Sequence, residues 1–121
     1  MTATEPLPPA LADTLENLRL ELRRGAVVIA VLAHLRTEHY GYALRKALGE
    51  QGMDIEENTL YPLLRRLETQ GLLDSEWREA DRRSKRFYRL SSDGEIVLGE
   101  LLEQWGDLDV AIERIIREDR P

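Results

Sequence analysis

The apolar positions in the first third of the chain predict two consecutive helices. The first apolar stripe repeats at spacings of four, three and four residues, and its members are Leu11, Leu15, Leu18 and Leu22. This spacing is typical of an amphipathic helix. Residues 24–36 follow as a nearly continuous apolar segment, which predicts a second helix that is buried on most of its sides. We expect that second helix to form the core of the domain.

Two shorter helices are predicted in the middle of the chain. Residues 43–50 form the first, and Gly49 and Gly52 stand where a helix stop and a turn are expected. The second covers about residues 56–70 and is closed by Gly71. Its apolar positions keep the i, i+3, i+4, i+7 pattern of one buried helix face, with Leu60, Leu63, Leu64 and Leu67.

The pattern then changes from helical to extended. Residues 72–79 and 84–90 are short segments that contain aromatic side chains, and the charged residues 80–83 separate them. Two short strands around a charged loop predict a β-hairpin. Trp77 lies on the first strand, and we expect it to pack that strand against the helices.

The C-terminal segment has the most regular pattern of the chain. Ser92 and Glu95 have the spacing of a capping box, which predicts the start of a helix that runs to about residue 118. Its apolar positions alternate between spacings of three and four, a period of 3.5 that is typical of a coiled coil and requires a partner helix. An ordinary core helix is the alternative interpretation. The predicted dimerisation residues are Leu98, Leu101, Leu102, Trp105, Leu108, Ile112 and Ile115.

Together these elements predict a mainly α-helical protein with a small β-hairpin. The order after residue 24 is helix, helix, helix, strand, strand, which is the order of a winged helix-turn-helix. We assign residues 1–9, which are rich in proline, to a flexible arm. Residues 10–91 then form the winged-helix domain, including its N-terminal helix, and residues 92–121 form the dimerisation helix.

The composition limits the chemistry of the protein. Its 121 residues, 42% apolar and 33% charged, suit one soluble domain. There is no cysteine and there are only two histidines, so we expect no metal site and no cofactor. We also expect that the protein is not an enzyme, because the sequence contains neither a Gly-rich phosphate loop nor a nucleophile paired with a base.

The same sequence predicts a cytoplasmic protein without a membrane segment. The longest apolar run, residues 26–33, is too short to span a bilayer. The first residues have neither the basic segment nor the apolar segment of a signal peptide.

The net charge of −6 argues against nucleic acid only if it is read as an average. Residues 93–121 contain nine acidic and three basic residues, whereas residues 1–53 and residues 54–90 are each neutral. Five bases without an intervening acid lie on the second predicted strand and its loop: Arg82, Arg83, Lys85, Arg86 and Arg89. This local run permits nucleic-acid binding by an acidic chain.

Double-stranded DNA is therefore the expected partner. A helix fits the major groove, and a hairpin reaches the neighbouring backbone, so we expect helix 56–70 to be the recognition helix and loop 80–86 to be the wing. The alternative for the helix residues is a solvated face, and for the tyrosines of segment 40–42 a core position. The predicted DNA contacts are Tyr40, Tyr42, Asn58, Thr59, Tyr61, Arg65, Arg66, Arg82, Arg83, Lys85 and Arg86.

Several segments resemble the PadR family of bacterial transcriptional regulators. The resemblance covers about residues 22–95, and its most specific part is Thr-Leu-Tyr-Pro-Leu-Leu. The length of the chain and its single C-terminal helix are similar to the compact branch of that family. The matching segments are Leu22-Arg23-Arg24-Gly25, Tyr40-Gly41-Tyr42-Ala43-Leu44, Thr59-Leu60-Tyr61-Pro62-Leu63-Leu64-Arg65-Arg66-Leu67-Glu68, Gly71-Leu72, Arg86-Phe87-Tyr88-Arg89-Leu90-Ser91 and Gly94.

The resemblance implies a winged-helix homodimer that represses promoters and releases them when a small molecule binds. In several members of the compact branch the effector lies at the dimer interface against a tryptophan of the last helix, and Trp105 stands at the matching place. A small aromatic or hydrophobic effector is therefore expected there. Interface packing alone is the alternative role of Trp105.

The chain departs from the family pattern at two places. Asn58 replaces the usual glycine before Thr-Leu-Tyr-Pro, which is a mild change because asparagine tolerates unusual backbone angles. The wing segment 81–84 contains no glycine or proline, which puts its conformation in doubt. Pro62, which the family shares, suggests that the recognition helix starts shortly before it.

A protein-docking adaptor is the alternative function. It would use the C-terminal helix to bind other proteins and would dimerise without affinity for DNA. This alternative does not account for the basic hairpin.

Overall fold

A single helix, α1, takes the place of the two predicted N-terminal helices. In the computed structural model, which describes residues 5–118, α1 spans Pro9–His34 without interruption. Gly25, close to the predicted boundary, lies inside α1 on the exposed surface, where a helical glycine costs only about 1 kcal/mol relative to alanine. The change of pattern at residue 24 marks the place where the helix enters the core, so the prediction of two helices was wrong.

The predicted arm overlaps the start of α1. Pro9 is the first residue of the helix, a position at which proline has no helical hydrogen bond to lose. Residues 5–8 precede the helix, and residues 1–4 lie outside the described residues. The flexibility of the segment before Pro9 stays a prediction.

A two-residue strand and two short helices follow. They are β1 (His39–Tyr40), α2 (Gly41–Glu50) and α3 (Glu57–Thr69). The last of these lies within the predicted range 56–70, and α2 begins two residues earlier than predicted. The sequence did not predict β1, because two residues are too few to show the alternation of a strand.

The predicted hairpin is present and belongs to a three-stranded sheet. Its strands are β2 (Leu73–Ala80) and β3 (Arg83–Leu90), and β1 pairs with the other edge of β3, so the order is β1-β3-β2 with antiparallel pairing throughout. Ala80 is paired with Arg83, which leaves a two-residue turn at the tip. The central strand β3 is therefore held on both of its edges.

The last helix, α4, spans Ser92–Glu118, as predicted for residues 92–118. The predicted capping box is wrong by one residue. The backbone N–H of Gly94 donates to Ser91 Oγ at 3.0 Å, and that hydroxyl donates to the carbonyl oxygen of Gly71 at 2.6 Å. Ser91 therefore caps α4 and ties its start to the turn that follows α3.

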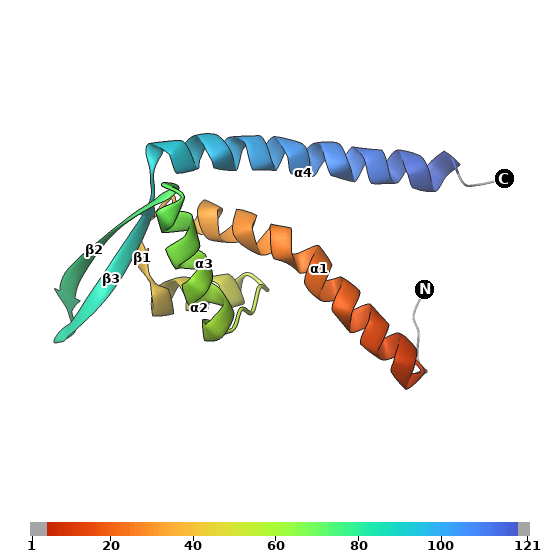
Figure 1. Cartoon of the computed structure of the whole chain (residues 1–121), viewed down its shortest axis with the longest axis horizontal. Helices are drawn as coiled ribbons and strands as arrows, with labels where there is room; N and C mark the ends of the chain where they lie inside the picture. The colour runs from red at the N-terminus through yellow and green to blue at the C-terminus, as the bar shows by residue number, and fades with distance from the viewer. Residues whose placement is uncertain (1–4, 119–121) are drawn as a thin grey trace.

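The core lies where the C-terminal half of α1 meets α2, α3, the sheet and the first turns of α4 (Figure 1). Its most deeply buried side chains are Val31, Leu32, Leu35, Leu44, Leu48, Leu60, Leu64 and Leu67. Away from this core, the N-terminal half of α1 and the C-terminal half of α4 extend as two diverging arms (Figure 1). Every residue from 102 to 118 is exposed in the single chain.

Gly94→Ala tests the close approach between α4 and the turn after α3. A β-carbon at residue 94 would lie 2.2 Å from the carbonyl oxygen of Leu72 and 2.6 Å from Cδ1 of Leu90. We expect this substitution to lower the free energy of unfolding by about 1–3 kcal/mol, the usual cost of overpacking. Urea unfolding at a fixed protein concentration measures the change.

Gly99→Ala is the matched control in the same helix. A β-carbon there has no neighbouring atom within 4 Å, so we expect this substitution to raise the stability by up to about 1 kcal/mol. Equal effects of the two substitutions would contradict the close packing at residue 94.

Candidate nucleic-acid interface

The outer face of α3 is formed by the residues that its leucines leave uncovered. Leu60, Leu63, Leu64 and Leu67 point into the core, so the remaining positions face solvent. Asn58 and Thr59 lie in the first turn, and Arg65 and Arg66 lie two turns later; all four are exposed. This arrangement presents polar side chains along the whole outer face of the helix.

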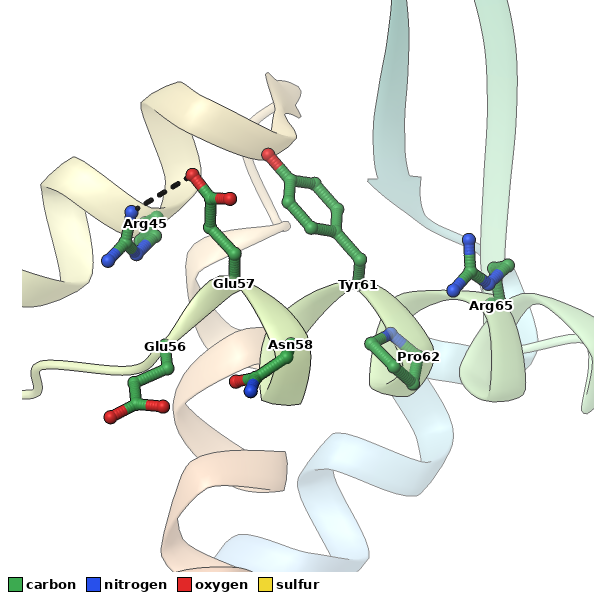
Figure 2. A pocket seen from close by; sticks show the side chains of 7 residues that line it. All are labelled: Arg45, Glu56, Glu57, Asn58, Tyr61, Pro62 and Arg65. Atoms are coloured by element: carbon green, nitrogen blue, oxygen red, sulfur yellow. Dashed lines mark hydrogen bonds and ion pairs between the residues drawn. The ribbon is translucent and has the colours of Figure 1, made fainter.

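Two arginines from other helices hold the turn before α3. Nε of Arg45, on α2, donates to the carbonyl oxygen of Ile55 at 2.8 Å, and Nη1 of the same side chain pairs with Glu57 at 3.3 Å (Figure 2). Nη2 of Arg23, on α1, donates to the carbonyl oxygen of Asp54 at 2.9 Å. The first turn of α3 is therefore fixed relative to both preceding helices. Neither arginine carried a sequence signal for this role.

Tyr61 links α3 to the start of α2. Its side chain rises from α3 towards α2 (Figure 2), and its ring occupies the space that a β-carbon on Gly41 would need, only 2.3 Å from Tyr61 Cε1. Gly41 is buried, and Tyr61 is half-buried. The predicted DNA contact at Tyr61 therefore also serves as packing, with its hydroxyl at the edge of the interface.

The tip of the wing has an unusual backbone. Asp81 and Arg82 both have positive φ, 53° and 66°, as expected for the two central residues of a type I′ hairpin turn. Glycine or asparagine normally occupies such positions, because other residues are strained there. Arg82 and its neighbour Arg83 are both exposed at this tip.

The other two predicted wing bases have partners within the protein. Nζ of Lys85 lies 4.1 Å from the centre of the Tyr40 ring and 3.4 Å from a carboxylate oxygen of Asp81. Arg86 donates from Nε to Ser75 Oγ at 3.0 Å and from Nη2 to both carboxylate oxygens of Glu68, at 3.1 and 3.0 Å. The hydroxyl of Ser75 donates in turn to Glu68. We call Glu68, Ser75 and Arg86 the wing clamp.

The wing clamp perturbs the carboxyl group of Glu68. The hydrogen bond from Ser75 is the main cause that lowers its pKa; partial burial opposes this, and the hydrogen bond and charge of Arg86 lower the pKa further. A carboxyl group with a depressed pKa in the folded state stabilises the protein above its unfolded pKa. That contribution is lost as the pH falls through the folded pKa.

The opposite side of the wing is tied to the loop before β1. Arg78, on β2, pairs with Glu38 of that loop and with Glu76 of its own strand, the latter at 3.0 Å. Its guanidinium also lies 4.1 Å from the centre of the Phe87 ring. The hairpin is therefore braced on two sides, by α3 and by the loop at residue 38.

A groove of about 670 Å³ runs between α3 and the wing. The tyrosines that line it are Tyr40, Tyr42, Tyr61 and Tyr88. The basic residues that line it are Arg65, Arg83, Lys85 and Arg86. Seven of these eight residues were predicted as DNA contacts from the sequence, and the fold brings the seven together along one groove.

Comparison with known proteins agrees with this arrangement. A model of the PadR-like family of transcriptional regulators matches residues 29–100. The chain belongs to the PadR-like family of transcriptional regulators. Members of this family bind DNA and are regulators, not enzymes.

Three relatives show how far the likeness extends. A PadR family transcriptional regulator from Eggerthella lenta has 45% sequence identity and a TM-score of 0.84, over 90% of this chain and 97% of its own. A Streptococcus transcriptional regulator has 31% identity and a TM-score of 0.71, over 78% and 95%. A transcriptional regulator of Mycobacterium tuberculosis is 41% identical over 81 residues, which are 66% of this chain and 76% of its own.

Trp77 differs from its sequence-based prediction. It is 62% exposed and lies on the groove side of the PadR-like wing, with the Arg86 guanidinium 5.5 Å from its ring centre. It lies on the same face of β2 as the buried Leu73 but four residues farther towards the tip of the wing, where it borders the groove, so it does not pack β2 against the helices. Like Glu68, it is a groove residue that the sequence pattern did not indicate.

Trp105 lies far along the exposed part of α4 and is 48% exposed in the single chain. The neighbouring seam positions Leu108, Ile112 and Ile115 are exposed to a similar degree. The effector role predicted for Trp105 stays a prediction.

Two features are absent from residues 5–118. No helix in that range has both the length and the hydropathy needed to cross a membrane. The same range contains no cluster of three or more histidine, cysteine, aspartate or glutamate side chains suited to hold a metal ion.

Arg82→Gly tests the strain at the wing tip. Glycine adopts positive φ without the steric cost that other residues incur, so we expect the substitution to raise the free energy of unfolding by about 1 kcal/mol. Arg82→Ala is the matched control, because it removes the same charge and keeps a β-carbon in the strained position. Thermal unfolding compares the two, and a gain for alanine equal to that for glycine would contradict the strain.

Proposed function

We propose that this PadR-like protein is a sequence-specific repressor that binds promoter DNA as a homodimer. In this proposal α3 enters the major groove, and residues 80–86 of the wing lie on the neighbouring backbone. The observation that carries it is the groove between α3 and the wing, because it joins the exposed face of a recognition helix to basic residues of the hairpin. The two half-sites would be about one helical turn apart.

The start of α3 is the part that reads the bases. Asn58 and Thr59 are exposed in its first turn, and recognition helices approach base edges with their N-terminal residues. Pro62 has no N–H, so it cannot donate the usual intrahelical hydrogen bond to the carbonyl oxygen of Asn58. Arg65 and Arg66 lie further along the exposed face and bind phosphate or base edges.

The wing and the tyrosines contact the DNA backbone. Arg82 and Arg83 are exposed at the tip, where phosphate neutralisation costs no internal ion pair. Lys85 lies over the ring of Tyr40 and reaches the same groove. Tyr42 is 60% exposed and supplies a hydroxyl donor beside them. These contacts position the protein without reading sequence.

Dimerisation is supported by the apolar arms that the single chain leaves exposed. A seam at period 3.5 on α4 requires a partner helix, and a second copy supplies both another α4 and another α1. The exposed apolar residues of the α1 arm are Leu11, Leu18, Leu20 and Leu22. Those of the α4 arm are Leu102, Trp105, Leu108, Val110, Ile112, Ile115 and Ile116.

The dimer interface is also the proposed effector site. A small aromatic or hydrophobic molecule against Trp105 would change the angle between the two α4 helices. Because each α4 is capped by Ser91 directly after the sheet, that change moves the two winged helices relative to one another. Binding of the effector would thereby release the promoter. We place the protein in the cytoplasm, where the promoter DNA of a bacterial cell lies.

A protein-docking adaptor is the second candidate. The same exposed arms favour it, since they suit a foreign helix as well as a second copy. It predicts no affinity for DNA, so one binding experiment separates the two functions.

Titration of the protein with fluorescent DNA from its own upstream region tests the proposal. We expect binding that resists excess non-specific competitor and weakens steeply with salt. Arg82→Gly and Arg82→Ala should lose affinity equally, because both remove one phosphate contact per wing, with a fall in the salt slope of about 0.9 per contact. Absence of binding at low salt would overturn the proposal and favour the adaptor.

Ile112→Glu tests the dimer. An unpaired charge buried in the seam is strongly unfavourable, so we expect the dimer to dissociate at micromolar concentration. Arg114→Glu is the matched control, because it places an acid on the same helix away from the seam and should leave the dimer intact. Light scattering coupled to size exclusion measures the mass, and a dimeric Ile112→Glu variant would contradict the proposed interface.

A further inference from the structure

We propose that Glu68 and Arg86 are positioning residues that set the angle of the wing relative to the recognition helix. In this proposal Arg86 is the exception within the wing segment 80–86: it promotes DNA binding through its ion pair with Glu68 and not as a phosphate contact. The inference rests on the proposed DNA-binding function, which it deepens.

The first argument is the connectivity of the wing clamp. Glu68 lies in the last turns of α3, Ser75 lies on β2 and Arg86 lies on β3, so the clamp joins the recognition helix to both strands of the wing. The Arg86 guanidinium contacts both carboxylate oxygens of Glu68. Both of these contacts come from Nη2, and Nε of the same guanidinium donates to Ser75 Oγ at 3.0 Å. A planar group held through two of its nitrogens fixes orientation as well as distance.

The second argument is the burial of the clamp. The Arg86 side chain is 37% exposed and the Glu68 side chain 26% exposed, whereas the tip residue Asp81 is 91% exposed. An ion pair with limited exposure is less screened by salt than a surface pair. Moving Arg86 to a phosphate would leave the partly buried carboxylate of Glu68 without its cation.

The third argument is the position of the clamp along the hairpin. Arg86 is paired with Trp77 in the register and follows the tip residue Arg83 by three residues on the same strand. At about 3.3 Å per residue, the tip lies roughly 10 Å beyond the clamp. A small change of angle at Arg86 is therefore enlarged at the tip, where Arg82 and Arg83 meet the backbone.

The brace on the other side of the wing does not replace the clamp. Arg78 and Glu38 connect β2 to the loop before β1, which holds the hairpin against the body of the domain. Among residues 5–118, the ion pairs of Arg78 and Glu38 do not involve α3. In the wing clamp, Ser75 and Arg86 both donate hydrogen bonds directly to Glu68 of α3. The clamp therefore connects the wing to the recognition helix itself.

The two possible roles of Arg86 predict opposite results for Glu68→Gln. If Arg86 were a phosphate contact weakened by a neighbouring acid, removal of that acid would raise the affinity for DNA. In the clamp, the same substitution loosens the wing. We expect it to weaken binding to the specific site by about tenfold or more, while binding to competitor DNA changes little.

Glu76→Gln is the matched control. Glu76 lies on β2, and among the described residues its ion pair is with Arg78 of the same strand. The substitution removes the same unit of negative charge from the wing as Glu68→Gln does. We expect its affinity for the specific site to stay within about twofold of the wild type or to rise. A loss equal to that of Glu68→Gln would overturn the proposal.

Two further variants test whether orientation or charge matters at residue 86. Arg86→Lys keeps the charge but loses the paired geometry, so a positioning role predicts a loss similar to that of Glu68→Gln. A phosphate contact would tolerate lysine, and wild-type affinity for Arg86→Lys would overturn the proposal. The exchanged pair Glu68→Arg with Arg86→Glu should recover part of the affinity, because it restores an ion pair between α3 and β3.

The fluorescence of Trp77 reports the clamp without DNA. Trp105→Phe leaves Trp77 as the only tryptophan, with the Arg86 guanidinium 5.5 Å from its ring centre. In that background Glu68→Gln should shift the emission of a folded protein, as checked by circular dichroism, and Glu76→Gln should not. An unchanged emission in Glu68→Gln would overturn the clamp geometry.

These readouts separate the inference from the function on which it rests. If the wild type fails to bind DNA, the proposed function is wrong, and the Trp77 emission still decides whether the clamp exists. If the wild type binds and Glu68→Gln binds equally well or better, the function stands and the positioning role is wrong.

Discussion

The burial of the leucine face of α3 is the constraint on which the rest of this structure depends. Leu60, Leu64 and Leu67 are almost completely inaccessible, and they pack against the C-terminal half of α1 and against α2. Each fully buried leucine contributes roughly 1.5–3 kcal/mol of transfer free energy. Because one face of α3 is fixed by this packing, the opposite face, with Asn58, Thr59 and the two following arginines, must point outward.

Polar contacts then set the angles that the leucine core leaves open. Hydrophobic packing is non-directional, so it places α3 in the core without fixing the wing beside it. Directional bonds do this at both ends of the helix: Arg45 holds its first turn, and Glu68 holds the wing near its last turn. The basic residues left at the tip, Arg82 and Arg83, retain their charges for a partner outside the chain.

The strained turn at Arg82 and the exposed apolar arms both lower the stability of the single chain, and both suit the proposed function. A glycine at residue 82 would adopt the positive φ without strain, whereas an arginine there can bind a phosphate. The seam of α4 is apolar over residues 102–116, which is unfavourable in a lone chain and favourable once a second copy covers it. Both features are consistent with a regulator of the PadR-like family that acts as a dimer on DNA.

Much of the fold was predictable from patterns of short range. The buried face of α3 and the apolar seam of α4 follow from periodicity, because a helix repeats its buried face at a fixed interval. The hairpin was predicted from two extended segments with aromatic residues around a charged loop, and the start of α4 from a capping pattern. The stretch from Thr59 to Glu68 also indicated the family, and with it the side of the protein that we propose to face DNA. The prediction was wrong where the hydrophobic pattern changed within one continuous helix. Residue 24 separated exposed from buried helix, and the pattern there was read as a boundary.

The sequence by itself determined which elements form, which faces are apolar and which segment carries the bases. Only the tertiary structure decided which bases have partners inside the protein. Arg86 and Arg82 are neighbours in one basic run, yet the fold places Arg86 beside Glu68, 18 residues earlier in the chain, and leaves Arg82 at the tip. The physical reason is that an ion pair depends on distance in space, and residues of different elements come together only when the core has packed.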